Sequence, residues 1–272
     1  MTPQMHLHIL ASGSKGNASV VEGPHGSILV DCGLSRRETF RRADELGIDL
    51  ADVRAVLVTH EHSDHVSGLS VWCNRFEGEL FATAGTAGAR GYLTALPFTL
   101  VSHDELFEVA GIRVQAFSTS HDVADPMGFR FMCGEGDEAD AIGYCTDTGL
   151  LTEGALEGLA GCRILALEAN HDVTMLKNGP YPAYLKERVA GSRGHLSNDQ
   201  AAEALRTLVG DDTETIVAMH LSQENNRPSV CVRTLATALD ADQANETFTE
   251  ARTPDGRLSI VAAGQDRPLS IW

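Results

Sequence analysis

The stretch THEHSDHVSG, residues 59–68, constrains the fold of this chain more than any other. It contains three histidines and two acids in close succession: His60, Glu61, His62, Asp64 and His65. It directly follows RAVLV, residues 54–58, an apolar run rich in β-branched residues that is typical of a buried strand. A buried strand that ends in imidazoles and carboxylates predicts a metal site at that end. The remaining ligands must then come from other parts of the chain.

Length and cysteine usage narrow the class of protein. The chain has 272 residues, of which 43% are hydrophobic, enough for one large domain or two small ones to form a core. No apolar run reaches the length of a membrane span, and MTPQMHLHIL at the start lacks the pattern of a secretory signal. Six scattered cysteines without a CxxC pair are typical of reduced thiols. We therefore expect a soluble, cytoplasmic protein with no membrane partner.

Short β-type runs recur along the chain, and helices follow them in each half. The runs include LHIL, ASVVEG, SILVDCG, RAVLV, IRVQAF, GFRFMC, AIGYC, RILALE and TIVAMH. Helices are expected from Ser35 to about Gly47, from about Ser197, and after Pro228. This order predicts two sheets packed face to face with helices outside, in one domain over residues 1–272. RLSIVAA and the last residues predict a closing pair of strands.

Three further strand ends carry a potential ligand. His121 comes shortly after VQAF, Asp147 follows AIGYC, and His220 follows TIVAM. With His60, His62, Asp64 and His65, they make seven potential ligands, which suits two ions that share one carboxylate. A lone histidine after a strand is more often structural than a metal ligand. A structural role does not readily explain why the HxHxDH cluster and three other strand ends all carry such residues.

HxHxDH followed by a distant His, an Asp and another His resembles the pattern of the metallo-β-lactamase-fold hydrolases. The resemblance implies an α/β fold, a four-layer αββα sandwich. It implies a first ion held by His60, His62 and His121 and a second held by Asp64, His65 and His220. Asp147 would bridge the two ions, with a hydroxide between them. The bridging residue is Asp rather than Cys, which is typical of hydrolases that keep two metals.

Further motifs narrow the resemblance to the YycJ/WalJ family. They are ASGSKGN (11–17), SHDVADPMGF (120–129), TDTG (146–149), LEANHD (167–172), GHLSN (194–198) and HLSQENN (220–226). The resemblance covers about residues 8–235 and leaves only the last thirty or so without a counterpart. It implies a 5′-to-3′ exonuclease that acts on DNA in repair or processing.

His195 stands outside the seven ligands and just before a helix start, so we expect it to protonate the leaving oxygen. The predicted catalytic residues are therefore Asp64 and His195. The alternative for His195 is that it only orients its loop. Ser197 caps the following helix, whose exposed N–H groups favour a phosphate. Ser12, Ser14 and Asn17 lie in a glycine-containing turn and are further candidates for substrate contact.

Asp31 ends the strand SILVD and is a candidate to orient a ligand histidine through its second nitrogen. The alternative is an Asp that forms the turn before Gly33. We assign no metal to His171 in EANHD. His6 and His8 share one face of the first strand, and we expect both at the surface.

Basic residues are few in a chain of net charge −17, which argues against nucleic-acid binding by bulk electrostatics. One local excess precedes His195 and consists of Lys177, Lys186, Arg188 and Arg193. It is either a phosphate-binding surface or a solvated helix face. A second cluster comprises Arg36, Arg37, Arg41 and Arg42, where a solvated helix face is the favoured interpretation.

These observations favour a phosphodiesterase with two divalent ions, Mn²⁺ or Zn²⁺, acting on nucleic acid, with DNA favoured over RNA. The alternative is a metal-dependent hydrolase of a small thioester or lactam. A metal-bound regulator is a third possibility, which the complete ligand set and the additional histidine oppose. The oligomeric state stays open.

Overall fold

The computed structural model describes residues 4–272 and divides into two compact units. Unit 1 comprises the residues up to 118 with 123–141 and 265–272, and unit 2 comprises 119–122 and 142–264. The single domain expected from the sequence stays a prediction. Among the residues described, no helix combines the length and the apolar character that a membrane span requires. All six cysteines are free thiols, as predicted.

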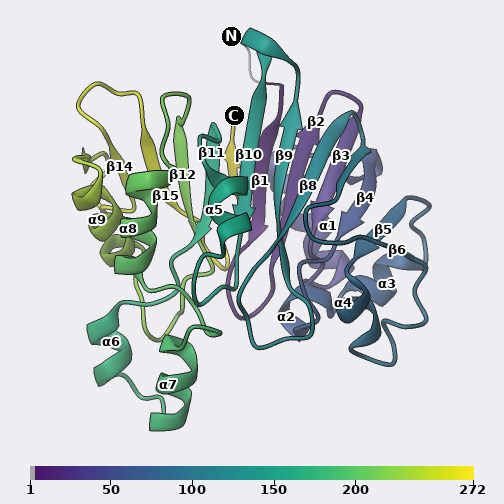
Figure 1. The fold of residues 1–272 in the computed structure, drawn as a ribbon, viewed down its shortest axis with the longest axis horizontal. Helices are drawn as coiled ribbons and strands as arrows, with labels where there is room; N and C mark the ends of the chain where they lie inside the picture. The colour runs from purple at the N-terminus through teal and green to yellow at the C-terminus, as the bar shows by residue number, and fades with distance from the viewer. Residues whose placement is uncertain (1–3) are drawn as a thin grey trace. The chain divides into compact units, whose positions relative to one another are not determined.

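Unit 1 is built on a seven-stranded sheet in the order β16-β1-β2-β3-β4-β5-β6 (Figure 1). Its strands are β1 (His6–Ala11), β2 (Ala18–Gly23), β3 (Gly26–Val30), β4 (Val53–Leu57), β5 (Glu79–Ala82), β6 (Phe98–Leu100) and β16 (Leu269–Ile271). Pairing is antiparallel from β16 to β3 and parallel from β3 to β6. The unit also holds an antiparallel set, β7 (Leu106–Val109), β8 (Ile112–Ser118) and β9 (Met127–Cys133).

Helix α1 (Arg36–Leu46) connects β3 to β4, as a crossover between parallel strands requires. Ser35 accepts from the backbone N–H of Glu38 at its start, and Gly47 ends it in the left-handed region at φ 74°. The predicted helix is therefore confirmed. The short helices of the unit are η1 (Leu50–Asp52), α2 (Ser63–Val66), α3 (Leu69–Cys73), α4 (Ala84–Gly88) and η2 (Gly136–Glu138).

Unit 2 contains a sheet in the order β10-β11-β12-β15-β14-β13, parallel from β10 to β15 and antiparallel beyond. Its strands are β10 (Asp140–Cys145), β11 (Ile164–Glu168), β12 (Thr215–Met219), β13 (Asp242–Gln243), β14 (Glu250–Arg252) and β15 (Ser259–Ala262). Its helices are α5 (Glu153–Leu159), α6 (Val173–Asn178), α7 (Ala183–Ala190), α8 (Asn198–Leu208) and α9 (Pro228–Ala238). The predicted helices after Ser197 and Pro228 are confirmed, and Ser197 forms a complete capping box with Gln200.

Parallel strands of one sheet end at a common edge, so the polar residues that follow them are brought together. In unit 1, Asp31 follows β3, and the segment 59–65 follows β4. In unit 2, Asp147 lies two residues after β10, Glu168 ends β11, and His220 follows β12. Each unit therefore gathers titratable side chains at the carboxyl edge of its parallel strands.

Two expectations were wrong. His8 is buried rather than at the surface, with its ring nitrogens 2.8 Å from Ser270 Oγ and 3.1 Å from a Glu22 oxygen. Arg42 is also buried and donates to the carbonyl oxygens of Leu10 and Gln265. The two closing strands expected from the sequence are confirmed as β15, which pairs with β12 and β14, and β16, which pairs with β1.

Candidate metal-binding residues

Four of the predicted ligands lie at the carboxyl end of β4 in unit 1. His62 stands at the N-cap of α2, which then carries Asp64 and His65. The ring centroids of His60 and His65 are 4.0 Å apart, and those of His60 and His62 are 4.9 Å apart. His65 Nε2 lies 3.6 Å from Asp64 Oδ2. The short helix therefore folds the HxHxDH motif into one compact cluster.

Asp31 fixes the orientation of His65. The two side chains are fully buried, and the Nδ1–H of His65 donates to Asp31 Oδ2 over 2.7 Å. The Asp31 carboxylate also accepts from the backbone N–H and the hydroxyl of Thr59. Because a carboxylate only accepts, the proton of His65 stays on Nδ1 and Nε2 carries the lone pair. The amide of Asn17 lies 2.9 Å from that Nε2 atom.

The turn 11–17 is tied to this cluster by its backbone. The Asn17 N–H donates to the Asp64 carbonyl oxygen, and the Gly33 N–H donates to the Asn17 carbonyl oxygen. The Asn17 side chain also closes the turn through hydrogen bonds in both directions with the Gly13 backbone. Ser12 is buried and Ser14 is exposed. Asn17 thus supports the histidine cluster, and substrate contact by Ser12 and Ser14 stays a prediction.

Gly33 should not tolerate a side chain. A Cβ atom there would lie 1.7 Å from the carbonyl oxygen of Asp64, so the backbone on one side must move. We expect Gly33→Ala to lower the free energy of unfolding by about 1–3 kcal/mol, the usual cost of overpacking. Denaturant unfolding measures this change. Gly88→Ala, where nothing lies within 4 Å of the added Cβ, is the matched control, and equal stability of both variants would contradict the tight packing.

Unit 2 gathers four titratable side chains from separate segments. Each of the four offers one possible ligand atom, and these atoms all lie within 4.8 Å of one another. The residues are Asp147, Glu168, His195 and His220. Thr146 donates its hydroxyl to Asp147 Oδ2 over 2.7 Å. Glu168 is absent from the residues predicted from sequence. Its signal was available, since it ends the apolar run RILALE just as Asp31 ends SILVD.

Glu168 orients two histidines at once. Its Oε1 atom accepts from Nδ1 of His195 over 2.8 Å and from Nδ1 of His220 over 2.9 Å. Its Oε2 atom accepts from the backbone N–H groups of Thr148 and Leu196. Both carboxylate oxygens are therefore engaged, so Glu168 serves to turn the two Nε2 atoms outward rather than to hold an ion itself.

The buried charges of this cluster shift the pKa values of Glu168 and His195. Burial alone would raise the pKa of Glu168, but the charge and hydrogen bond of His195 and the hydrogen bond of His220 hold it below its usual range. Burial alone would lower the pKa of His195, yet the charge and hydrogen bond of Glu168 and the charge of Asp147 raise it. Glu168 therefore favours the protonated form of His195, and His195 favours the ionised form of Glu168.

His121 is held by the loop that precedes α8. Its Nδ1–H donates to the carbonyl oxygen of Gly194 over 3.0 Å, so the lone pair of the ring is on Nε2. In turn, the guanidinium of Arg193 donates to the backbone carbonyl of His121. His121 Nε2 lies 3.9 Å from Asp147 Oδ1. The loop that carries His195 therefore also positions His121.

Three of the seven non-glycine residues with positive φ in residues 4–272 belong to these clusters. Asp31, Asp147 and His220 have φ values of 61°, 53° and 52°, in the left-handed region that side chains other than glycine seldom adopt. Each such residue costs on the order of 1 kcal/mol, and residues of this kind cluster at functional sites.

The donor set fits divalent metal ions. His65, His121 and His220 each have Nδ1 committed to an acceptor, so all three present the same nitrogen, Nε2, as a ligand. Imidazole nitrogens combined with carboxylate oxygens suit Zn²⁺, Mn²⁺ and Fe²⁺.

The basic segment 177–193 lies on α6, α7 and the following loop of unit 2. Arg188 forms an ion pair with Asp122, and Arg193 is engaged with His121, so these two arginines have structural partners. Lys177 and Lys186 line a cavity of about 560 Å³ that also reaches His171 and Ser197. The segment is therefore neither a plain solvated face nor a row of four free cations.

Comparison with known proteins places the chain in a family. The model of the β-lactamase superfamily domain matches residues 27–221. The exodeoxyribonuclease YycJ of Bacillus anthracis is 32% identical over 240 residues, which are 87% of this chain and 89% of YycJ. The exodeoxyribonuclease WalJ of Streptococcus pneumoniae serotype 2 is 35% identical over 240 residues, 85% of this chain and 87% of WalJ.

A solved structure supports the fold independently of sequence. Zn²⁺-bound PqqB from Methylobacterium extorquens superposes with a TM-score of 0.67 at 16% identity, covering 98% of this chain and all of that one. This likeness and the family match confirm the predicted α/β sandwich with the metallo-β-lactamase fold. The chain belongs to the β-lactamase superfamily and, within it, to the family of the exodeoxyribonucleases YycJ and WalJ.

Proposed function

We propose that this protein is a metal-dependent nuclease that degrades DNA from the 5′ end in repair or processing. Two relatives of which the chain covers almost the full length are named exodeoxyribonucleases, which supports DNA over RNA as the substrate. The single observation that carries the proposal is the same hydrogen-bonding pattern at His65, His121 and His220. Each of these histidines donates its Nδ1–H to an acceptor, so Nε2 is the nitrogen that can bind a metal ion. The six free thiols suit a reducing compartment, so we place the activity in the cytoplasm.

Seven residues hold two divalent ions in this proposal. They are His60, His62 and His121 for one ion, Asp64, His65 and His220 for the other, and Asp147 shared by both. Two bound ions supply charge neutralisation for a phosphodiester and lower the pKa of a bound water towards neutrality. The protein orients the ligands through Asp31 on His65, Gly194 on His121 and Glu168 on His220.

His195 is placed to handle the proton of the leaving oxygen. Its side chain is 19% exposed, whereas that of His220, which shares the same Glu168 oxygen, is 3% exposed. Its Nδ1–H is bound to Glu168, so Nε2 is the nitrogen that faces a substrate. The carboxylate fixes the ring and favours the imidazolium that donates a proton. His195 is therefore proposed as the general acid.

Lys177 and Lys186 line a cavity with Ser197 and offer a route for the DNA backbone there. Changing both to Gln should weaken binding of a single-stranded oligonucleotide and reduce the slope of log affinity against log salt by about 1.4, since each phosphate contact contributes about 0.7. Thermal stability should hardly change, because exposed charges contribute little to folding. Arg206→Gln combined with Arg233→Gln, on α8 and α9, is a control of equal charge. An unchanged slope in the lysine variant would assign the two lysines to plain surface.

A substrate panel tests the proposed function against small-molecule hydrolysis. Purified protein is incubated with Mn²⁺ or Zn²⁺ and with a 5′-phosphorylated labelled oligonucleotide, a generic thioester or a β-lactam. We expect mononucleotides to be released from the oligonucleotide and no turnover of the other two compounds. Turnover of the thioester or the lactam alone would overturn the proposal.

A further inference from the structure

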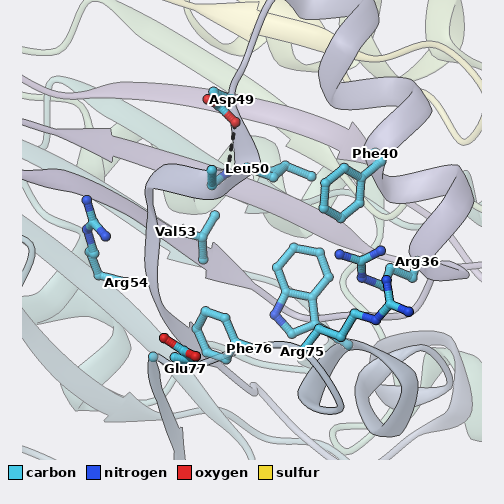
Figure 2. Close-up of a pocket in the computed structure, with 12 residues that line it drawn as sticks. Arg36, Phe40, Asp49, Leu50, Val53, Arg54, Arg75, Phe76 and Glu77 are labelled. Carbon is cyan, nitrogen blue, oxygen red and sulfur yellow. Dashed lines mark hydrogen bonds between the residues drawn. The ribbon is translucent and has the colours of Figure 1, made fainter.

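A second cavity, on unit 1, carries chemistry that the proposed metal site does not use (Figure 2). Its volume is about 600 Å³, and it is formed by α1, η1, α3 and the turn after α3. Cavities that bind small molecules measure about 300–1,000 Å³, so this one can take a ligand as large as a nucleotide.

One wall of the cavity is aromatic. The ring centroids of Phe40 and Trp72 are 5.7 Å apart, and those of Trp72 and Phe76 are 5.9 Å apart. Phe40 is 39% exposed, an unusual position for so large an apolar side chain, whereas Trp72 is buried. The indole nitrogen of Trp72 is also buried and has no hydrogen-bond partner within residues 4–272, which is rare for a polar group. The flat ring of a ligand can stack on such a wall.

Two arginines meet at the end of the cavity near Phe40. Figure 2 shows the side chains of Arg36 and Arg75 converging there, and Arg36 Cζ lies 4.4 Å from the centre of the Phe40 ring. Neither arginine has an acidic partner in the described part of the chain, whereas Arg41 and Arg42 on the same helix both pair with Glu38. Two unpaired guanidinium groups that converge favour a bound anion, and phosphate suits their fork of donors.

The acidic residues lie at the other end. Figure 2 shows Arg54, Asp49 and Glu77 on the side of the cavity away from Arg36 and Arg75. Nη2 of Arg54 lies 3.6 Å from Oδ1 of Asp52, so the positive charge of Arg54 is partly balanced. An anionic group is therefore favoured only at the Arg36 end, beside the aromatic wall.

We propose that this cavity binds one nucleotide unit, with its base against Phe40 and its phosphate on Arg36 and Arg75. The choice of ligand rests on the proposed nuclease function, and the nucleotide is either part of the substrate strand or a free mononucleotide. The cavity reaches Val53 at the start of β4, and His60 follows the end of that strand. At about 3.3 Å per residue, the two points are roughly 20 Å apart, a span of about six nucleotides at the spacing of a duplex strand, so a mononucleotide or a dinucleotide does not reach both.

Tryptophan fluorescence tests the site directly. Trp72 and Trp272 are the only tryptophans, and Trp272 lies at the chain end against His6 and His8. In a Trp272→Phe background, Trp72 alone reports the cavity. Titrations without metal use dAMP, deoxyadenosine and a single-stranded ten-nucleotide DNA. We expect the emission of Trp72 to change with dAMP, with the DNA or with both, and this difference separates a free mononucleotide from the substrate strand as the ligand. Deoxyadenosine, which lacks the phosphate, should bind at least about tenfold more weakly than dAMP.

The arginines are tested by a matched pair of variants. Arg36→Gln with Arg75→Gln should weaken the fluorescence-detected binding about tenfold or more, and Arg37→Gln, an exposed neighbour that does not line the cavity, should leave it unchanged. In hydrolysis assays the double variant should raise KM for a twenty-nucleotide substrate and not for a dinucleotide. No response of Trp72 to either phosphate ligand, or binding unaffected by the double change, would overturn this site. Nuclease activity measured in parallel on unaltered protein shows separately whether the proposed function stands.

Discussion

His195→Ala is expected to lower kcat on a DNA phosphodiester by about 10²–10⁴-fold, the usual contribution of general acid catalysis. Glu168 holds the ring through Nδ1, and the seven proposed ligands do not include His195. The variant should therefore keep its fold and its metal content. Steady-state kinetics with metal analysis on the same preparation measures both quantities.

The leaving group separates proton donation from a general loss of the site. A nitrophenyl phosphodiester has a leaving group that needs little protonation, so its hydrolysis should fall much less than that of DNA. His25→Ala, a change at an exposed turn, is the control and should leave both substrates unaffected. Equal losses on both substrates would reject the proton-donor role, and loss of one metal equivalent would show that His195 is a ligand.

Asp147→Ala is expected to lower the occupancy of both metal positions and to abolish most of the activity, because the proposed ligand set assigns this carboxylate to both ions. Alanine in the left-handed region at φ 53° also adds strain, so Asp147→Asn is the better-matched variant, since Asn tolerates that conformation. Both variants should bind less than two equivalents of metal. Metal content per chain after identical preparation decides this point.

Two comparisons complete the test of Asp147. His220→Ala should chiefly empty one position, so its metal content should exceed that of Asp147→Ala. Asp211→Ala, an exposed carboxylate of the same unit, should retain two equivalents. Two full equivalents in Asp147→Ala would contradict a shared carboxylate.

The sequence predicts the elements around the site because their signals are local. The strand 54–58 is apolar and ends where the HxHxDH motif begins, and the structure has β4 at Val53–Leu57. The caps at Ser35 and Ser197 act within three residues of themselves, and both helices begin there. Glu168 ends a strand as Asp31 does, so its position was visible in the sequence. Its role was missed because the two imidazoles that it orients come from 27 and 52 residues away.

Burial of polar groups by distant segments could not be predicted in the same way. His8 alternates with apolar residues like an exposed strand position, but β16 pairs with β1 and brings Ser270, 262 residues away, to its ring. Arg42 has the spacing of a solvated helix face, yet it reaches carbonyl groups of Leu10 and Gln265. Among the four arginines of that helix, only packing distinguishes the buried Arg42 from Arg36, which lines the second cavity.

Stepwise metal restoration tests the central claim most directly. Protein stripped by a chelator is supplied with Mn²⁺ or Zn²⁺ in fractions of an equivalent, and mononucleotide release from a 5′-phosphorylated labelled oligonucleotide is recorded at each step. The two-metal nuclease predicts no release from the stripped protein and a rise in activity that levels off at two equivalents per chain. A plateau at one equivalent, or release by the stripped protein, would contradict the account.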